Sequence, residues 1–367
     1  MSKEVLVTQK SIPAIVITGG PCGGKTSALA WLKDKLLDYG IYPVFSQELA
    51  RVYIGAGLHP ALVGSVPFQT TLVRATISQE EHLLKLAANL TQDTVVLICD
   101  RGRMDTKGYL TPHEFNRMLS HNGWNEPMLR DRFYQAVLHM VTAADGAEQF
   151  YVADSERYES LDEARLIDQK TQVAWCGHPH FRLIDNSTDF EGKKHRLLKE
   201  ILHVLGVPIP LEIERKFKIK RPDWHHLSGA TKFEIEQVYL TRTDADVEER
   251  VRRRSQEGQA IYFRTLKRAR GSGIREEREW QISESEYHTA FEQRDRNLRV
   301  IRKDRWCFVH NYQYFELDDF TPMGEDSCVL EIELTDRNDV VSLPNWLRSV
   351  EEVTDNPAYS NYERART

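Results

Sequence analysis

The stretch 211–220, LEIERKFKIK, sets acidic and basic side chains two residues apart. Glu212, Glu214 and Lys216 alternate with apolar residues, and successive side chains of a β-strand point to opposite faces. A strand here would therefore present two carboxylates and an ammonium on one face. Clustered carboxylates repel one another and favour a divalent cation. The pattern suits metal-dependent phosphate chemistry if other strands repeat it.

Six further stretches between residues 249 and 334 carry charged side chains on one face. Those that share a face are Arg250, Arg252 and Arg254; Thr265 and Lys267; Arg275, Glu277 and Glu279; Lys303 and Arg305; Glu316 and Asp318; and Glu331 and Glu333. If such strands close on themselves with their apolar side outward, the charged side lines a bore. Burying ions is costly, so a charged bore favours a wet binding tunnel. The alternative is an antiparallel sheet with one solvated face.

A second motif lies near the start of the chain. Residues 14–18, AIVIT, predict a buried strand, and a stretch with helical spacing follows the glycine-rich loop. The loop GGPCGGKT fits GxxxxGK[ST] with Gly19, Gly24, Lys25 and Thr26. Its amides would cradle phosphates, Lys25 would reach the β- and γ-phosphates, and Thr26 would bind Mg²⁺. The alternative is a glycine-rich turn with a chance lysine.

Two more stretches place polar residues at the ends of predicted strands. Residues 42–50 predict a strand ending near Glu48, and residues 94–102 predict another with Asp100 and Arg101 at its carboxyl end. Ligands bind at the carboxyl edge of a parallel sheet. Asp100 could hold the Mg²⁺ shell or act as a base on an acceptor hydroxyl, and it could equally cap a helix. A structural role for Glu48 is as good an interpretation as a functional one.

Residues 149–154 and 181–185 predict the remaining strands of this part. Arg157 and Arg165 lie between them, where small-molecule kinases carry a lid that brings arginines to the phosphates. A solvated helix face explains these two arginines equally well. Strands that alternate with helices over about 200 residues predict an α/β doubly wound domain.

The composition sets the limits for both parts. The chain has 367 residues and a net charge of −6, and its length predicts two domains. Its five cysteines are scattered, which predicts neither a disulfide framework nor a zinc site. The Gly- and Pro-containing stretch 203–213 separates domains 1–206 and 211–367. No apolar run approaches the ~20 residues that cross a bilayer, so we expect a cytoplasmic protein without a transmembrane segment. The small net charge gives no reason to expect nucleic-acid binding.

Residues 14–205 resemble the AAA-like ATPase/kinase family that includes nicotinamide-riboside kinase domains. The resemblance rests on ITGGPCGGKT, on DRG after the third strand and on WCGHPHFRLIDN. It implies binding of ATP or GTP and leaves open whether the phosphate goes to water or to an acceptor. Residues 186–189, NSTD, lack the lysine of the guanine motif NKxD, which favours ATP.

Residues 211–367 resemble the CYTH family, the triphosphate tunnel metalloenzymes. The signature is Glu212-x-Glu214-x-Lys216, and the supporting matches are RVR at 250–252, TLK at 265–267, KDR at 303–305, ELD at 316–318 and EIE at 331–333. The resemblance implies an α+β domain built on an eight-stranded antiparallel β tunnel that acts on triphosphates with Mg²⁺ or Mn²⁺.

The same resemblance implies roles for individual residues. The implied metal ligands are Glu212, Glu214, Glu331, Glu333 and Asp318, although Asp318, like Glu277 and Glu279, could instead orient basic residues. The implied triphosphate-binding residues are Lys216, Arg250, Arg252, Lys267, Lys303 and Arg305, and Lys216 could instead position the attacking water. The metal would neutralise phosphate charge and activate water, and the arginines would stabilise the equatorial oxygens.

Three functions remain open from the sequence. The first is a metal-dependent triphosphatase whose N-terminal domain binds and turns over ATP. The second is a kinase of a small hydroxyl compound with a phosphate-sensing tunnel. The third is a nucleotide-switched protein that binds a phosphorylated ligand, such as an inositol phosphate or a lipid head group. Four paired acids count against the third, because pure phosphate binding needs cations rather than carboxylates.

Overall fold

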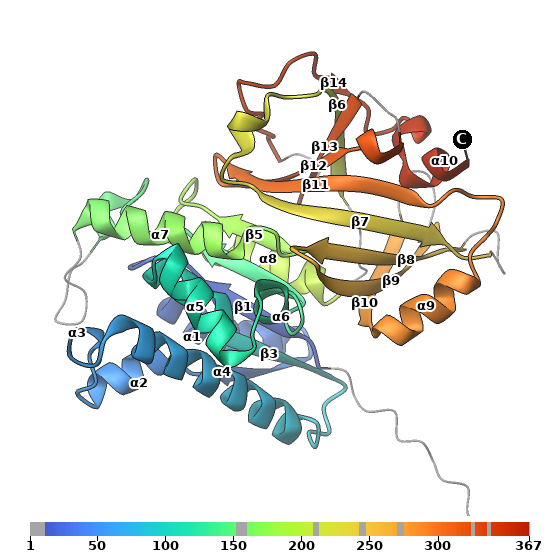
Figure 1. Cartoon of the computed structure of the whole chain (residues 1–367). Helices are drawn as coiled ribbons and strands as arrows, with labels where there is room; N and C mark the ends of the chain where they lie inside the picture. Colours follow the sequence, from blue (N-terminus) through green and yellow to red (C-terminus); the bar gives the residue numbers. More distant parts are fainter. Residues whose placement is uncertain are drawn as a thin grey trace, which may run out of the picture. The chain divides into compact units, whose positions relative to one another are not determined.

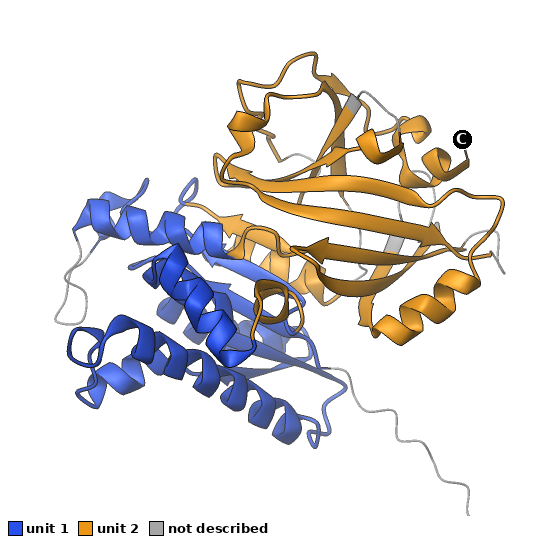
Figure 2. Cartoon of the chain, in the orientation of Figure 1, with its two compact units in different colours: residues 1–123, 133–174, 186–194 blue, residues 124–132, 175–185, 195–367 orange. Residues whose placement is uncertain are grey.

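The computed structural model describes residues 12–151, 160–207, 213–241, 247–269, 275–323, 327–335 and 339–366. Two predicted site residues, Glu212 and Arg157, lie outside these ranges. The chain forms two compact units, made of residues 1–123, 133–174 and 186–194 and of residues 124–132, 175–185 and 195–367 (Figure 2). The division into domains 1–206 and 211–367 stays a prediction.

The first sheet has five strands in the order β2-β3-β1-β4-β5 (Figure 1). The strands span Ala14–Thr18 (β1), Ile41–Ser46 (β2), Thr94–Asp100 (β3), Ala136–Met140 (β4) and Phe181–Ile184 (β5). The ladders that join β1 to β4 into one sheet are parallel. Every residue of β1 and β4 is buried, as is typical of a parallel sheet covered by helices. The predicted α/β class of this part is confirmed.

One predicted strand is wrong in position. We expected a strand over residues 149–154, of which 152–154 lie outside the described residues, but Glu148–Phe150 form a 3₁₀ turn and Phe150 is 71% exposed. The fourth strand is instead β4, with the sequence AVLHM. Both runs are short and apolar, and strand propensity alone does not decide which of two such runs finds a place inside a sheet.

Eight helices accompany the first sheet in the described part of the chain. They span Lys25–Asp38 (α1), Leu49–Gly55 (α2), Pro60–Val63 (α3), Ser65–Ala87 (α4), Pro112–Asn122 (α5), Glu126–Arg130 (α6), Leu161–Trp175 (α7) and Phe190–Val204 (α8), and Arg103–Tyr109 form a 3₁₀ helix. Local signals set their ends. The helix α5 begins with a capping box in which the Thr111 and Glu114 side chains bind each other's backbone amide, and it ends before Gly123 at φ +65°.

The second sheet is antiparallel and has nine strands in the order β10-β9-β8-β7-β11-β12-β13-β6-β14 (Figure 1). They span Glu214–Lys220 (β6), Thr231–Tyr239 (β7), Val247–Gln256 (β8), Gln259–Ala269 (β9), Arg275–Ile282 (β10), Ile301–His310 (β11), Gln313–Asp319 (β12), Ser327–Glu333 (β13) and Glu351–Glu352 (β14). The sheet thus contains eight antiparallel strands, β6 to β13, the number that the resemblance implies, and the two-residue β14, which pairs with β6. The strand β7 belongs to none of the charged stretches singled out in the sequence.

Short helices complete this part of the chain. They are the α-helices Glu284–Glu292 (α9) and Asn361–Arg366 (α10) and the 3₁₀ turns Trp224–Leu227, Thr321–Met323 and Pro357–Tyr359. The apolar face of the sheet is buried in a cluster that includes Phe217, Ile219, Leu317, Leu330 and Ile332. These residues alternate along β6, β12 and β13 with the charged residues of the predicted site, as the two-residue period of a strand requires.

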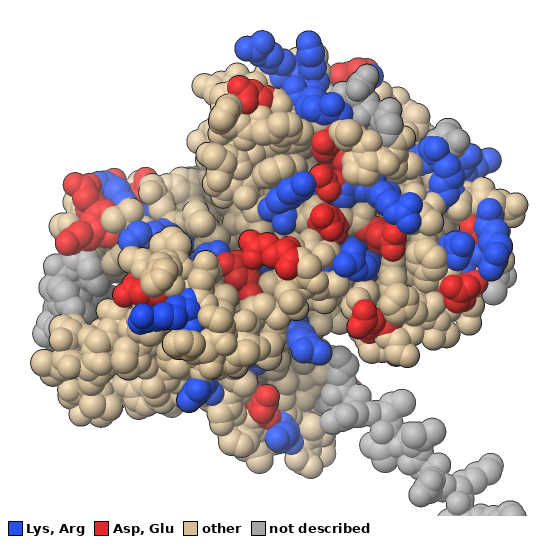
Figure 3. Space-filling model, viewed as in Figure 1, with Lys and Arg blue, Asp and Glu red and all other residues tan. Residues whose placement is uncertain are grey.

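Two further observations concern charge and hydropathy. On the face of the molecule shown in Figure 3, basic and acidic side chains are interspersed. No helix in the described ranges is long and apolar enough to cross a membrane.

Candidate functional site

The glycine-rich loop joins β1 to α1 and has the backbone shape of an anion cradle. Gly19 has φ +142° and a Cβ there would overlap the Met140 carbonyl oxygen, so only glycine fits. Lys25 is buried and its Nζ donates to the carbonyl oxygens of Gly19 (3.1 Å) and Gly20 (3.0 Å). Thr26 is exposed in the first turn of α1. The loop therefore presents helix-terminal amides, a lysine and a hydroxyl, which together suit a phosphate chain.

A buried carboxylate that the sequence reasoning missed holds this loop in place. Asp168 of α7 accepts hydrogen bonds through Oδ1 from the amides of Gly20 (2.7 Å) and Thr142 (3.1 Å). His139 Nε2 lies 2.9 Å from the same oxygen. Burial raises the pKa of Asp168, but His139 and the hydrogen bonds outweigh it and the pKa is lowered overall. Residue 168 lies 148 positions from Gly20, and no local motif marks it.

Charged residues at the ends of β2 and β3 lie beside the loop. Arg101, at φ +74°, donates to the Gly19 carbonyl (2.7 Å) and to Glu48 (3.2 Å). Asp100 has a buried Oδ1 with no hydrogen-bond partner among the described residues. Burial, together with the charge of Glu48, raises the pKa of Asp100 to about 6. Burial, together with the charge of Arg101, lowers the pKa of Lys25 to about 8. The predicted residues Lys25 and Asp100 are therefore brought together.

The structure gives Arg165 a local role. Its guanidinium pairs with Glu148 (3.0 Å) and Asp162 (2.9 Å), and the side chain is 33% exposed. These contacts fit the solvated-helix interpretation. Arg157, the other predicted lid arginine, lies outside the described residues.

The charged face of the second sheet forms two connected groups of ion pairs. In the first, Lys216 Nζ lies 3.0 Å from Glu214 Oε1 and 3.0 Å from Glu331 Oε1. Arg305 binds Asp318 through two parallel hydrogen bonds (2.6 and 2.7 Å) and also contacts Glu331 (2.8 Å). The register explains this meeting, because Glu331 pairs with Lys216 and Arg305 pairs with Asp318 across neighbouring strands.

Lys303 belongs to the same group and is only 3% exposed. Its Nζ forms an ion pair with Asp318 and donates to Asn361 of α10 (3.3 Å). Burial lowers the pKa of Lys303 to about 8, although Asp318 opposes the shift. Arg305 is 6% exposed. Such burial argues against a solvated sheet face, where these cations would lie in water.

The second group lies on β8, β9 and β10. Glu277 contacts Lys267 (2.7 Å) and Arg250 (3.3 Å), and Glu279 contacts Arg252 (2.8 Å) and accepts a hydrogen bond from the Thr265 hydroxyl (2.7 Å). The Nε atoms of Arg250 and Arg252 are buried and have no hydrogen-bond partner among the described residues.

The environment of Arg252 is rich in positive charge. Burial lowers the pKa of Arg252, and the charges of Arg250, Arg305 and Arg254 lower it further against the effect of Glu279. Several buried guanidinium groups that repel one another form a site that an anion would stabilise. The predicted triphosphate-binding residues therefore lie on one face of the sheet, where Lys267, Lys303 and Arg305 are buried and Lys216, Arg250 and Arg252 are partly buried.

Two of the charged residues that the sequence placed on this face, Glu333 and Arg254, contact residues outside the two ion-pair groups. Glu333 forms an ion pair with Arg182 of β5, and His203 of α8 lies 3.6 Å from its second oxygen. Arg254 donates to the Gly177 carbonyl and pairs with Asp131 (3.5 Å). Sequence reasoning missed Arg182 and His203, since neither belongs to a local pattern.

The carboxylates suit a hard cation by chemistry but are occupied by basic side chains. Among the described residues, no three His, Cys, Asp or Glu side chains gather into a ready cation site. Glu214 and Glu331 converge on Lys216 Nζ, which shows that the two can share one positive charge. Their oxygens are of the kind that Mg²⁺ and Mn²⁺ prefer, and Glu212 precedes them on the same alternation.

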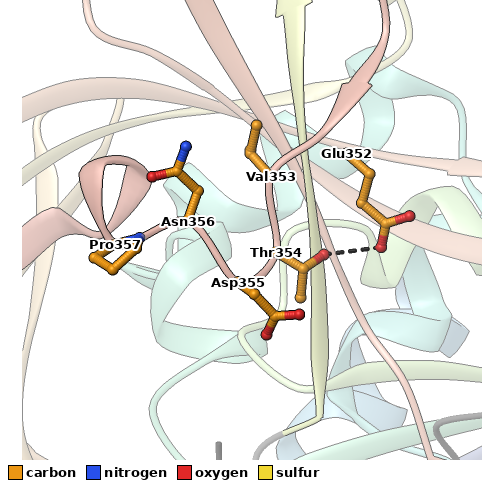
Figure 4. A pocket seen from close by; sticks show the side chains of 6 residues that line it. All are labelled: Glu352, Val353, Thr354, Asp355, Asn356 and Pro357. Atoms are coloured by element: carbon orange, nitrogen blue, oxygen red, sulfur yellow. Dashed lines mark hydrogen bonds between the residues drawn. The ribbon is translucent and has the colours of Figure 1, made fainter.

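A hollow of about 510 Å³ adjoins the backbone of β6 (Figure 4). Residues 352–357 line it, and the Thr354 hydroxyl donates to Glu352 (2.9 Å), as the dashed line in Figure 4 shows. The Lys216 amide donates to Thr354 (3.1 Å). The hollow is thus next to the Lys216 backbone, and none of the charged ladder residues lines it.

Comparisons with known proteins agree with both resemblances. A family model described as an AAA domain matches residues 14–193, and one described as a CYTH domain matches residues 210–348. These matches confirm the predicted fusion. A search of curated proteins found no match.

Three solved structures are similar to parts of this chain. The inorganic triphosphatase NE1496 is 28% identical with a TM-score of 0.31, over 42% of this chain and 95% of that one. A putative adenylyl cyclase from Hippeastrum, described as having a dominant triphosphatase activity, is 18% identical with a TM-score of 0.26, over 34% and 80%. The deoxyadenosine kinase from M. mycoides with bound dATP is 14% identical with a TM-score of 0.37, over 51% and 98%.

Proposed function

Because the chain joins an AAA domain of the P-loop type to a CYTH domain, we propose that its C-terminal part hydrolyses a triphosphate with Mg²⁺ or Mn²⁺ and that its N-terminal part binds and turns over ATP. The observation that carries the proposal is the buried charged face of the second sheet. There, Lys303 and Arg305 are almost fully buried, and the Nε atoms of Arg250 and Arg252 have no hydrogen-bond partner among the described residues. Such donors are costly inside a hydrophobic core, whereas the oxygens of a triphosphate can accept hydrogen bonds from them.

The residues divide the work by charge. Arg250, Arg252, Lys267, Lys303 and Arg305 bind the phosphate oxygens and stabilise charge that develops on them. The remaining predicted residues, Glu212, Glu214, Glu331, Glu333 and Asp318, supply carboxylate oxygens for the metal or hold the basic side chains in place. When bound, the metal neutralises phosphate charge and lowers the pKa of a water nucleophile. Lys216 Nζ contacts both Glu214 and Glu331.

The test is phosphate release from tripolyphosphate, ATP and GTP with Mg²⁺ or Mn²⁺. Wild type is compared with Glu214→Gln, Lys25→Ala and the control Glu284→Gln, whose side chain is 68% exposed on α9. We expect Glu214→Gln to lower hydrolysis of one triphosphate by about 10²-fold or more, since each 1.36 kcal/mol of lost transition-state stabilisation is tenfold in rate. Lys25→Ala should leave tripolyphosphate hydrolysis intact. Unchanged hydrolysis in Glu214→Gln, or none in wild type, would reject the proposal for these substrates.

A second function of the N-terminal part is favoured by Asp100. Asp100 has a pKa of about 6, and its buried Oδ1 has no hydrogen-bond partner within the described ranges, which suits a general base that takes a proton from an acceptor hydroxyl. Transfer of the γ-phosphoryl group to that hydroxyl would make this part a small-molecule kinase. ADP formation that depends on an added hydroxyl compound and is lost in Lys25→Ala would support it. ADP formation at the same rate without any acceptor would assign the phosphate to water.

A further inference from the structure

The loops that follow β4 and β5 are fastened to each other near the glycine-rich loop. Asn186 donates through Nδ2 to the carbonyl oxygens of Thr142 (2.8 Å) and Asp145 (2.6 Å). Its Oδ1 accepts from Lys193 Nζ (2.7 Å), and Lys193 also donates to the Val141 carbonyl (2.6 Å). Both donor hydrogens and the acceptor of the Asn186 amide are therefore used inside the protein.

An aromatic ring adjoins this fastened pair of loops and the phosphate cradle. Phe190 is the first residue of α8, and a Cβ on Gly24 would overlap its Cε2 and lie 3.0 Å from its Cζ. The ring thus packs directly against the residue that precedes Lys25. Phe190 is nevertheless 39% exposed. Lys194 lies over this ring (5.3 Å) and over the ring of Trp31 (5.2 Å), which fixes the ring's surroundings on one side.

We propose that Phe190 stacks on the base of a purine nucleotide whose phosphates occupy the Gly19–Thr26 loop, and that the Asn186 amide does not read this base. A nucleotide carries its base on a short ribose tether, so phosphates in the loop confine the base to the adjoining surface. A partly exposed ring there supplies a stacking face, and stacking accepts adenine and guanine alike because each has a π-face of the same two-ring size. The site therefore takes ATP and GTP with similar affinity.

The inference rests on the proposed nucleotide binding and deepens it by naming the ligand class. It replaces the preference for ATP that the missing lysine of NSTD suggested. A guanine-selective site needs side-chain groups that bond to the base edge, and leaving such groups unpaired is what rejects the wrong base. In this chain Asn186 is committed to backbone carbonyls, and Asp189 Oδ1 accepts from the Gly192 amide (2.8 Å).

The test measures equilibrium binding of ADP, GDP, CDP and pyrophosphate to the full-length chain by calorimetry. Diphosphates avoid hydrolysis of a triphosphate during the titration. The component that is missing in Lys25→Ala is assigned to the glycine-rich loop. The variants are Phe190→Ala, Phe190→Trp and the control Tyr39→Ala, which removes a 51% exposed ring at the far end of α1.

Base stacking is worth about 1–3 kcal/mol, so Phe190→Ala should weaken ADP and GDP about 5- to 150-fold. Pyrophosphate binding should stay within about twofold of wild type, since it has no base to stack. Phe190→Trp should retain affinity and so show that the altered site still folds. In wild type, ADP and GDP should bind within about fivefold of each other, and CDP, with its smaller ring, should bind more weakly.

Several results would overturn the inference. Unchanged ADP affinity in Phe190→Ala would remove the stacking role. An equal loss of ADP and pyrophosphate binding would make Phe190 a support of the loop rather than a base contact. A preference of wild type for ADP or GDP greater than about tenfold would show that the base edge is read. If Lys25→Ala removes no component of ADP binding, the proposed nucleotide binding at the loop fails, and that failure is distinct because it is measured without any change at Phe190.

Discussion

The raised pKa of Asp100, which suits it to act as a base, also lowers the stability of the fold. Burial and the nearby Glu48 raise its pKa to about 6, above the ordinary aspartate value near 4. Between these two pH values the folded chain binds more protons than the unfolded chain. The free energy of unfolding therefore falls as the pH rises from about 4 to about 6, and the loss is complete above pH 6.

Replacing Asp100 by asparagine should separate these two properties. We expect Asp100→Asn to raise the free energy of unfolding at pH 7 by about 1–2 kcal/mol, because the buried charge is gone, and to have much less effect near pH 4. Turnover that depends on Lys25 should be lost in the variant and, in wild type, should rise with pH through about 6. Urea unfolding at both pH values and a pH–rate profile check this. Equal stabilisation at both pH values would contradict the argument.

At the scale of elements, the sequence predicted the features that depend on residue spacing within a single segment. The strand–loop–helix unit around Lys25 and the alternation along β6, β12 and β13 follow from spacing alone, and both are present. Contacts between distant segments could not be predicted in this way. Asp168 reaches Gly20 across 148 positions, and Arg182 reaches Glu333 from another sheet. No periodicity encodes such pairs, because tertiary packing chooses them.

The alternation makes a quantitative prediction for β13. Leu330 is fully buried between Phe217 and Leu317 on the neighbouring strands, whereas Val340 is 84% exposed. Leu330→Ala should lower the free energy of unfolding by about 2–5 kcal/mol, because it leaves a cavity in the apolar cluster. The control Val340→Ala should change it by no more than about 0.5 kcal/mol. Chemical denaturation measures both, and similar values for the two would mean that the apolar face of the sheet is not buried.

At the scale of the whole molecule, the two phosphate sites that we propose are built by different means. The loop before α1 uses backbone amides and one lysine, while the second sheet uses guanidinium groups held by carboxylates. In the described contacts, Lys25 and Arg252 share no partner. Arg305 is less suitable as a probe, since its removal would take one cationic partner from each of Asp318 and Glu331 and leave only Lys303 and Lys216 to balance them.

A double variant therefore tests whether the two sites act separately. We expect Arg252→Ala to raise the KM for tripolyphosphate about tenfold or more, through the loss of a charged hydrogen bond worth about 1.5–3 kcal/mol, and to leave ADP binding unchanged. Lys25→Ala should weaken ADP binding and leave the KM for tripolyphosphate unchanged. For each readout, the free-energy change of the double variant should equal the sum of the two single-variant changes to within about 0.5 kcal/mol, because residues without shared partners act independently. A larger departure would mean that the two proposed sites are coupled, and each site would then have to be assayed with the other one filled.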